Sequence, residues 1–222
     1  MSARVLQAAV VALWPLLLVG NAFGHPEVEL TAESYLAAAA ADPWKWYAVH
    51  LVAASAALLT IPSAVVVRSL VPGRGRRWAT AGTVLAVVGG VALVVAFSIE
   101  AGVMRVATEL DRQAALAVTD EHLASPEAYL VPVGILGTAV GVILLSVALV
   151  VGRAVPTWQA VLYGVGAGAT LAPASPGSVL GSVGFVLLAV AAFLVAKQVL
   201  AGPTSLGTER GRRLPARAPV AS

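Results

Sequence analysis

Three histidines, His25, His50 and His122, are the residues of this 222-residue chain best suited to metal or proton chemistry. Imidazole nitrogens bind transition metals, and a carboxylate such as Glu100 is a common further ligand. The histidines show no local ligand spacing such as His-x-x-x-His. Together with Glu100 they nevertheless define a candidate metal or haem site on one side of a membrane. The alternative is that His25 and His122 are solvated loop residues.

His50 and Glu100 are predicted to form a polar pair across a helical hairpin. His50 lies 18 residues before Arg68, and Glu100 lies 22 residues after Trp78, on either side of one basic turn. At ~1.5 Å per residue both lie roughly 30 Å from that turn and about one helical turn apart in height. A carboxylate beside an imidazole stabilises the charged form of each and avoids an unsatisfied polar group near lipid. We interpret the pair as structural, and an outer ligand site is the alternative.

The rest of the sequence offers little that enzymes use. The chain has no cysteine, which excludes disulfides, thiolate metal sites and cysteine nucleophiles. It contains no nucleophile elbow, Gly-rich phosphate loop or metalloprotease motif. We therefore expect no catalytic residues and no cofactor.

Composition indicates a membrane protein. Hydrophobic residues make up 59% of the chain, charged residues 11%, and the mean hydropathy is +0.90. Such a chain needs lipid as the solvent for much of its surface. The calculated pI of 9.7 comes from cations in short loops beside apolar stretches. Without a basic face with interleaved aromatic residues, we expect no nucleic-acid partner; anionic lipid headgroups at the inner face are the predicted partners, and the sequence specifies no protein partner.

The charges alternate between successive loops. One set of segments carries Arg4, Arg68, Arg74, Arg76, Arg77, Arg153, Lys197, Arg210, Arg212, Arg213 and Arg217. The other set carries every acidic residue except Glu209, with only Lys45, Arg105 and Arg112 as cations. Cationic loops stay in the cytoplasm during insertion. The alternation predicts an all-α transmembrane bundle in a bacterial plasma membrane, with six spans and both termini cytoplasmic.

The predicted six-helix domain covers residues 1–201, and a basic, disordered cytoplasmic tail covers 202–222. The spans are expected at about 5–23, 46–67, 78–99, 129–151, 158–172 and 179–199. The first is alternatively a cleaved signal peptide, because Arg4, an apolar run and Ala22-Phe23-Gly24 match its three regions.

Local signals predict the outer helix starts. Asp42-Pro43, Ser125-Pro126 and Ser175-Pro176 each combine an N-cap residue with a proline at the first helical position. Thr31 is expected to cap a short interfacial helix, and residues 105–123 are expected to form an outer amphipathic helical extension. Trp44, Trp46 and Tyr47 are expected at headgroup level.

Two small-residue motifs predict close helix packing. Gly137-x-x-x-Gly141 and Gly164-x-x-x-Gly168 each place glycines on one helix face. We expect these faces to pack against neighbouring helices of the same chain, and a dimer interface is the alternative.

The turns "GRGRRWATAG" and "GRAVPTWQAVL", with the acidic loop before the second span, resemble those of small uncharacterised six-span integral membrane proteins of high-GC actinobacteria. The resemblance implies a fold and a location, and no activity. We therefore expect a non-enzymatic protein that packs with, senses or binds partners. A small-solute transporter or permease is the alternative, although no charged residue is expected at the bilayer midplane.

Overall fold

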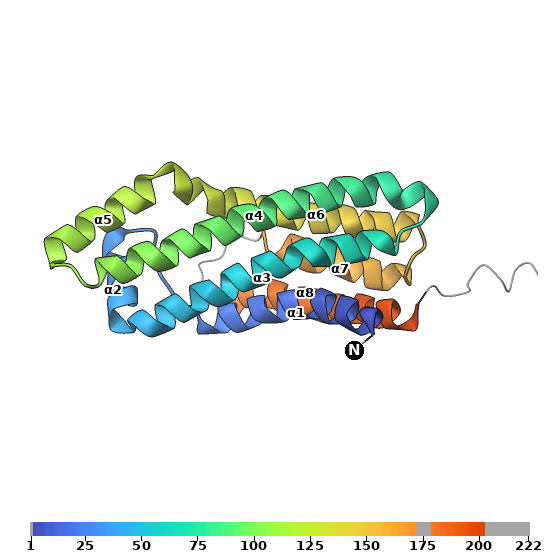
Figure 1. The fold of residues 1–222 in the computed structure, drawn as a ribbon, viewed down its shortest axis with the longest axis horizontal. Helices are drawn as coiled ribbons and strands as arrows, with labels where there is room; N and C mark the ends of the chain where they lie inside the picture. The colour runs from blue at the N-terminus through green and yellow to red at the C-terminus, as the bar shows by residue number, and fades with distance from the viewer. Residues whose placement is uncertain (1, 172–178, 203–222) are drawn as a thin grey trace, which may run out of the picture.

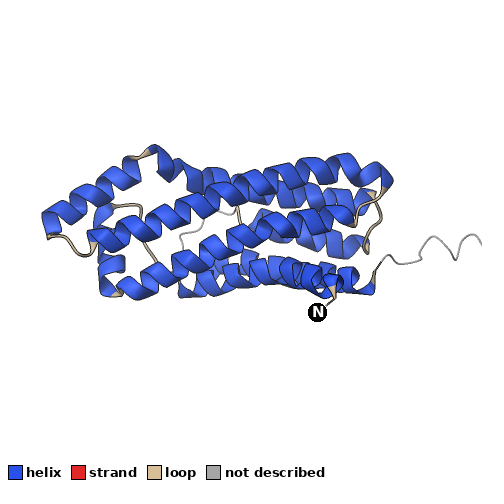
Figure 2. Ribbon diagram, in the orientation of Figure 1, coloured by secondary structure: helices blue, strands red, loops and turns tan. Residues whose placement is uncertain are grey.

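The computed structural model describes residues 2–171 and 179–202, with the side chains of 179–181 excepted. Every regular element in these ranges is a helix (Figure 2). The elements are α1 (Ala3–Gly24), α2 (Ala32–Ala41), α3 (Pro43–Ser69), η1 (Gly73–Gly75), α4 (Arg76–Ala107), α5 (Arg112–Ala124), η2 (Pro126–Tyr129), α6 (Leu130–Val151), α7 (Thr157–Ala169) and α8 (Val179–Ala201). The predicted all-α class is confirmed.

Five helical segments in the described ranges are long and apolar enough to cross a membrane. They are Ala3–Gly24, Pro43–Ser69, Gly73–Ala107, Pro126–Val151 and Ser182–Ala201. These segments overlap five of the six predicted spans. The remaining prediction, at 158–172, corresponds to α7. That helix has 13 residues and rises only about 20 Å, less than the ~30 Å hydrocarbon core.

The long helices form a closed bundle (Figure 1). Each packs mainly against two neighbours, in the order α1, α3, α4, α6, α7, α8 and back to α1, and α3 also contacts α6. Val11, Trp14, Leu145 and Tyr163 are almost fully buried in the core that these helices share. The bundle therefore has an apolar interior as well as an apolar surface.

Charge separates the two ends of the bundle. Helices α2 and α5 lie at the end away from the N-terminus, while the α3–α4 and α6–α7 turns lie at the same end as the N-terminus (Figure 1). Gly202 lies against the Arg4 guanidinium, so the two limits of the described chain also meet there. The cationic end carries Arg4, Arg68, Arg74, Arg76, Arg77, Arg153 and Lys197; the acidic end carries Glu27, Glu29, Glu33, Asp42, Glu100, Glu109, Asp111, Asp120, Glu121 and Glu127, with Lys45, Arg105 and Arg112.

Two of the predicted helix starts have the expected caps. The backbone N–H of Lys45 donates to Asp42 Oδ1 at 2.9 Å, and that of Ser34 donates to Thr31 Oγ1 at 3.3 Å. Ser125 does not cap in this way, because its hydroxyl donates to the His122 carbonyl at 2.7 Å. A 3₁₀ turn follows, and α6 begins only at Leu130. The Ser175-Pro176 prediction lies outside the described residues.

Glycines set the contact between α4 and α6. A Cβ on Gly141 would lie 2.5 Å from Ala86 N and 2.7 Å from the Gly82 carbonyl oxygen. One on Gly137 would lie 3.1 Å from Gly89 Cα. The predicted face of Gly137 and Gly141 therefore packs on α4 within the chain.

The two glycines of the second small-residue motif differ in their contacts. A Cβ on Gly164 would lie 2.6 Å from Ser146 Oγ, so this glycine brings α7 close to α6. A Cβ on Gly168 would meet only the Ile143 side chain, at 4.0 Å. Only the first glycine of this pair makes a close helix contact.

Candidate functional site

The candidate site lies near the acidic end of the bundle, where α3 and α4 bring His50 and Glu100 together. His50 Nε2 is 3.3 Å from Glu100 Oε1, so the two side chains predicted to pair are in contact. The His50 side chain is 2% exposed and the Glu100 side chain 11%. This is a buried polar contact between two long apolar helices.

A second contact fixes how the His50 ring holds its protons. His50 Nδ1 lies 2.8 Å from the Trp46 carbonyl oxygen, one helical turn earlier. A carbonyl only accepts hydrogen bonds, so Nδ1 carries a proton and donates it. Nε2 of a neutral ring is then an acceptor facing a carboxyl oxygen. A hydrogen bond between them requires one further proton, held either by His50 as imidazolium or by Glu100 as a carboxylic acid.

His25, which follows α1, joins the site from a third helix. Its ring centroid is 5.2 Å from that of His50, in an edge-on arrangement. Its Nδ1 lies 2.7 Å from the Pro26 carbonyl oxygen, which again makes Nδ1 the donor. The site therefore connects α1, α3 and α4 through His25, His50 and Glu100.

Aromatic rings enclose these groups. Trp46 is 2% exposed, and its ring centroid lies 4.6 Å from that of His50 and 5.4 Å from that of His25. Phe97 lies on another side, at 6.2 Å from His50. The two tryptophans predicted at headgroup level differ in burial. Trp46 faces the bundle interior, whereas Trp44 is 70% exposed, with Arg105 over its ring.

The buried Trp46 also connects the site to the two short helices at the acidic end. Tyr35 of α2 packs against the Trp46 ring at 5.6 Å between centroids. Met104, on the last turns of α4, belongs to the same buried cluster and accepts a weak contact from Thr119 of α5 at 4.0 Å. We call α2 and α5 the cap. Its packing therefore depends on the elements that hold His50 and Glu100.

The electrostatics of His25 oppose its protonation. Burial lowers the pKa of His25 below its ordinary value of 6.5, and the nearby His50 and Lys45 act in the same direction. The hydrogen bond to Pro26 and the charge of Glu100 act in the opposite direction without overcoming burial. Burial, with the Glu100 charge, likewise raises the pKa of Tyr35. The site thus favours a neutral His25.

The chain matches no protein-family model, no curated protein and no solved structure. The resemblance drawn from its turns stays a prediction.

The candidate metal set does not assemble around His122. This residue lies in α5, where its carbonyl accepts hydrogen bonds from Ser125 and its side chain interacts with the Glu127 charge. In the part of the chain that the structure describes, no three His, Asp or Glu side chains converge as metal ligands would. His50 adjoins both His25 and Glu100, and the Nδ1 atoms of both imidazoles already make hydrogen bonds.

A second cluster of polar side chains is buried in the bundle core and was not predicted from the sequence. The Tyr163 phenol of α7 lies beside Ser63 of α3 and Trp14 of α1. Trp14 Nε1 and Ser63 Oγ face this phenol without a hydrogen bond of good geometry. No charged residue of the described chain belongs to this cluster.

Proposed function

We propose that the chain is a multi-pass protein of a bacterial plasma membrane, with six crossings and both termini in the cytoplasm. The five apolar helices and the charge difference between the two ends support this. Cationic loops stay inside during insertion, which assigns the cationic end to the cytoplasm and the cap to the outside. Helix α7 begins the fifth crossing from the cationic end.

The proposed orientation predicts which loops are accessible from outside the cell. The chain has no cysteine, so an introduced one is the only target for a maleimide. Glu121→Cys in the cap and Thr157→Cys at the cationic end are both at exposed positions. With a membrane-impermeant maleimide, we expect Glu121→Cys to react in intact cells and Thr157→Cys only after permeabilisation. Equal labelling of both in intact cells would contradict the orientation.

The proposed role is non-enzymatic: the protein senses the proton concentration outside the membrane through the His25–His50–Glu100 site. The observation that carries this role is the 3.3 Å contact of His50 Nε2 with Glu100, in which the Trp46 carbonyl leaves one proton to be shared. His25 faces His50, Glu100 and Lys45. Gain or loss of a proton at this site therefore alters the contacts between α1, α3 and α4. The cap reports that change because it packs on Trp46 and Met104.

The sign of the pH dependence follows from His25. Its pKa is lowered in the folded protein, so near pH 6.5 the unfolded state binds more protons than the folded one. The contribution of His25 to stability is therefore fully present above pH 6.5 and is lost as the pH falls from 6.5 through the folded pKa. Acidification adds a cation beside His50 and Lys45 in a buried site, and we expect it to loosen the cap.

Hydrogen–deuterium exchange in lipid nanodiscs tests this role. Between about pH 8 and about pH 5, we expect amide protection of α2 and α5, corrected for intrinsic exchange, to fall once the pH drops below the ordinary histidine value. His25→Phe keeps a ring against Trp46 and should remove most of this pH dependence. His122→Ala, which lies outside the site, should keep it. Protection that is independent of pH, or that depends on His122 alone, would contradict the proposed role.

A further inference from the structure

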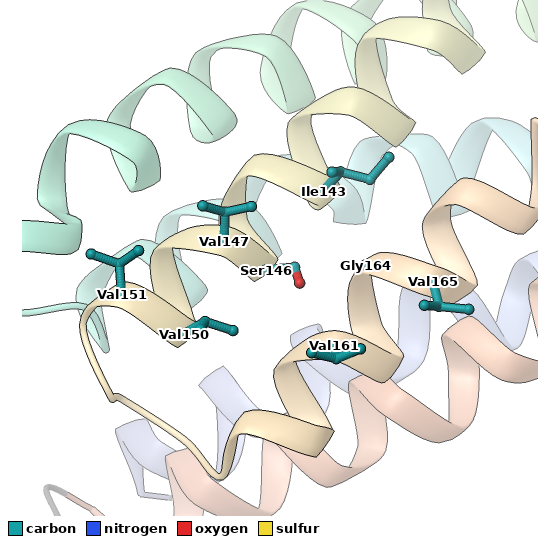
Figure 3. A pocket seen from close by; sticks show the side chains of 8 residues that line it. All are labelled: Ile143, Ser146, Val147, Val150, Val151, Val161, Gly164 and Val165. Carbon is teal, nitrogen blue, oxygen red and sulfur yellow. The ribbon is translucent and has the colours of Figure 1, made fainter.

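An apolar groove runs along the bundle surface between α6 and α7 (Figure 3). It has a volume of about 350 Å³ and is lined by Ile143, Ser146, Val147, Val150, Val151, Val161, Gly164 and Val165. Gly164 contributes no side chain, and the Ser146 hydroxyl donates to the Ala160 carbonyl at 2.5 Å, so neither adds a free polar group. The surface offered is almost entirely hydrocarbon.

The groove occupies the half of the bundle toward the cationic end. On α6 its lining extends from Ile143 to Val151, the last residue of that helix. That stretch rises about 12 Å, close to the ~15 Å thickness of one hydrocarbon leaflet. Val161 is 49% exposed and Val165 54% exposed, which shows that the groove opens outward from the bundle. Its length and polarity fit one acyl chain of the adjacent leaflet.

Arg153 lies in the turn that joins the two helices of the groove, two residues after Val151. Its φ of 51° is in the left-handed region, the only such non-glycine case in residues 2–171 and 179–202. The turn ends α6 in a Schellman arrangement, with Ala154 N donating to the Leu149 carbonyl and Arg153 N to the Val150 carbonyl. Glycine is the residue that usually takes this position, because a Cβ is unfavourable there.

A cation thus occupies a backbone position better suited to glycine, at the end of an apolar groove. Trp158, 58% exposed on the first turn of α7, adds an aromatic ring of the kind found at headgroup level. A basic residue beside a cleft between membrane helices is suited to a phosphate headgroup. Glycine would adopt the φ of Arg153 with less strain, so the backbone conformation gives no reason for an arginine at this position.

We propose that this groove binds an anionic phospholipid of the leaflet at the cationic end, with one acyl chain between α6 and α7 and its phosphate at Arg153. The proposal rests on the membrane embedding proposed above and is independent of the site at the acidic end. One lipid is bound by both an apolar surface and a charge. This differs from the non-specific attraction of all cations at that end to the membrane surface.

The test is binding of phosphatidylglycerol to the full-length protein, measured by native mass spectrometry and by thermal unfolding in nanodiscs. We expect Arg153→Gly to weaken phosphatidylglycerol binding relative to phosphatidylcholine by about five-fold, the contribution of one cation near a membrane surface. Glycine suits the left-handed turn, so the variant should fold at least as well. Arg4→Ala removes a cation of the same end from α1, across the bundle from α6, and should leave the preference unchanged.

A second pair of variants tests the groove itself. Val161→Trp fills it and should reduce retention of the bound lipid, while Val190→Trp adds the same ring at an equally exposed position, 49% in each case, on α8. Equal lipid preference in wild type and Arg153→Gly would overturn the proposal. A wild-type dimer that becomes a monomer in Val161→Trp would also overturn it, because the groove would then bind a second copy of the chain. The maleimide labelling of Glu121→Cys tests membrane embedding separately, so the two failures are distinguishable.

Discussion

Replacing Glu100 with alanine is expected to lower the free energy of unfolding by about 3 kcal/mol, the lower limit for removing one partner of a buried pair. His50 Nε2 would lose the group that lies 3.3 Å away, in a site where the imidazole is 2% exposed. The measurement is reversible unfolding in mixed micelles, followed by tryptophan fluorescence at neutral pH.

Two further variants separate the pair from other effects of the substitution. In Glu100→Gln the side-chain amide still donates to a neutral His50 Nε2, so we expect it to lose less stability than Glu100→Ala. Combining Glu100→Ala with His50→Ala should give less than the sum of the two single losses, because the second change removes a group already without its partner. Additive losses would show that the two residues stabilise the protein independently.

Gly141→Ala is expected to destabilise the protein by about 2 kcal/mol, in the range found for overpacked cores. The new methyl would lie 2.5 Å from Ala86 N and 2.7 Å from the Gly82 carbonyl oxygen. Both are backbone atoms of α4, so relief requires the two helices to move apart and not a change of rotamer. Unfolding in mixed micelles measures the loss.

Gly168→Ala is the matched control, because it adds the same methyl in the second small-residue motif. Its Cβ would meet only the end of the Ile143 side chain at 4.0 Å. Alanine is a better helix former than glycine by about 1 kcal/mol, so this variant should be neutral or more stable. If both substitutions destabilised the protein equally, close packing of α6 on α4 would not explain the cost at Gly141.

The sequence was informative wherever a property depends on distance along a helix. A helix rises by a constant amount per residue, so counting outward from the α3–α4 turn places His50 and Glu100 at matching heights. The caps at Thr31 and Asp42 are local in the same sense, because each bonds to a backbone N–H three residues later. The alternating charges likewise indicated which turns lie at which end.

Properties that depend on how helices rotate against one another were not predictable in this way. Nothing in the sequence distinguishes Trp46, which faces the interior beside His25 and His50, from Trp44, which faces outward. The contact of His25 with His50 depends on where α1 ends relative to α3, which is set by tertiary packing.

Nitrogen-15 NMR of histidine-labelled protein in bilayers directly tests where the protons of the buried His50–Glu100 pair lie. A His50→Gln variant identifies the His50 signals by their absence. The structure predicts that Nδ1 of His50 is protonated at neutral pH, as the donor to the Trp46 carbonyl, and that the Nε2 signal shifts in Glu100→Ala because its partner is gone. A neutral His50 ring protonated at Nε2 alone, with signals insensitive to Glu100→Ala, would contradict the shared-proton pair and with it the proposed sensing role.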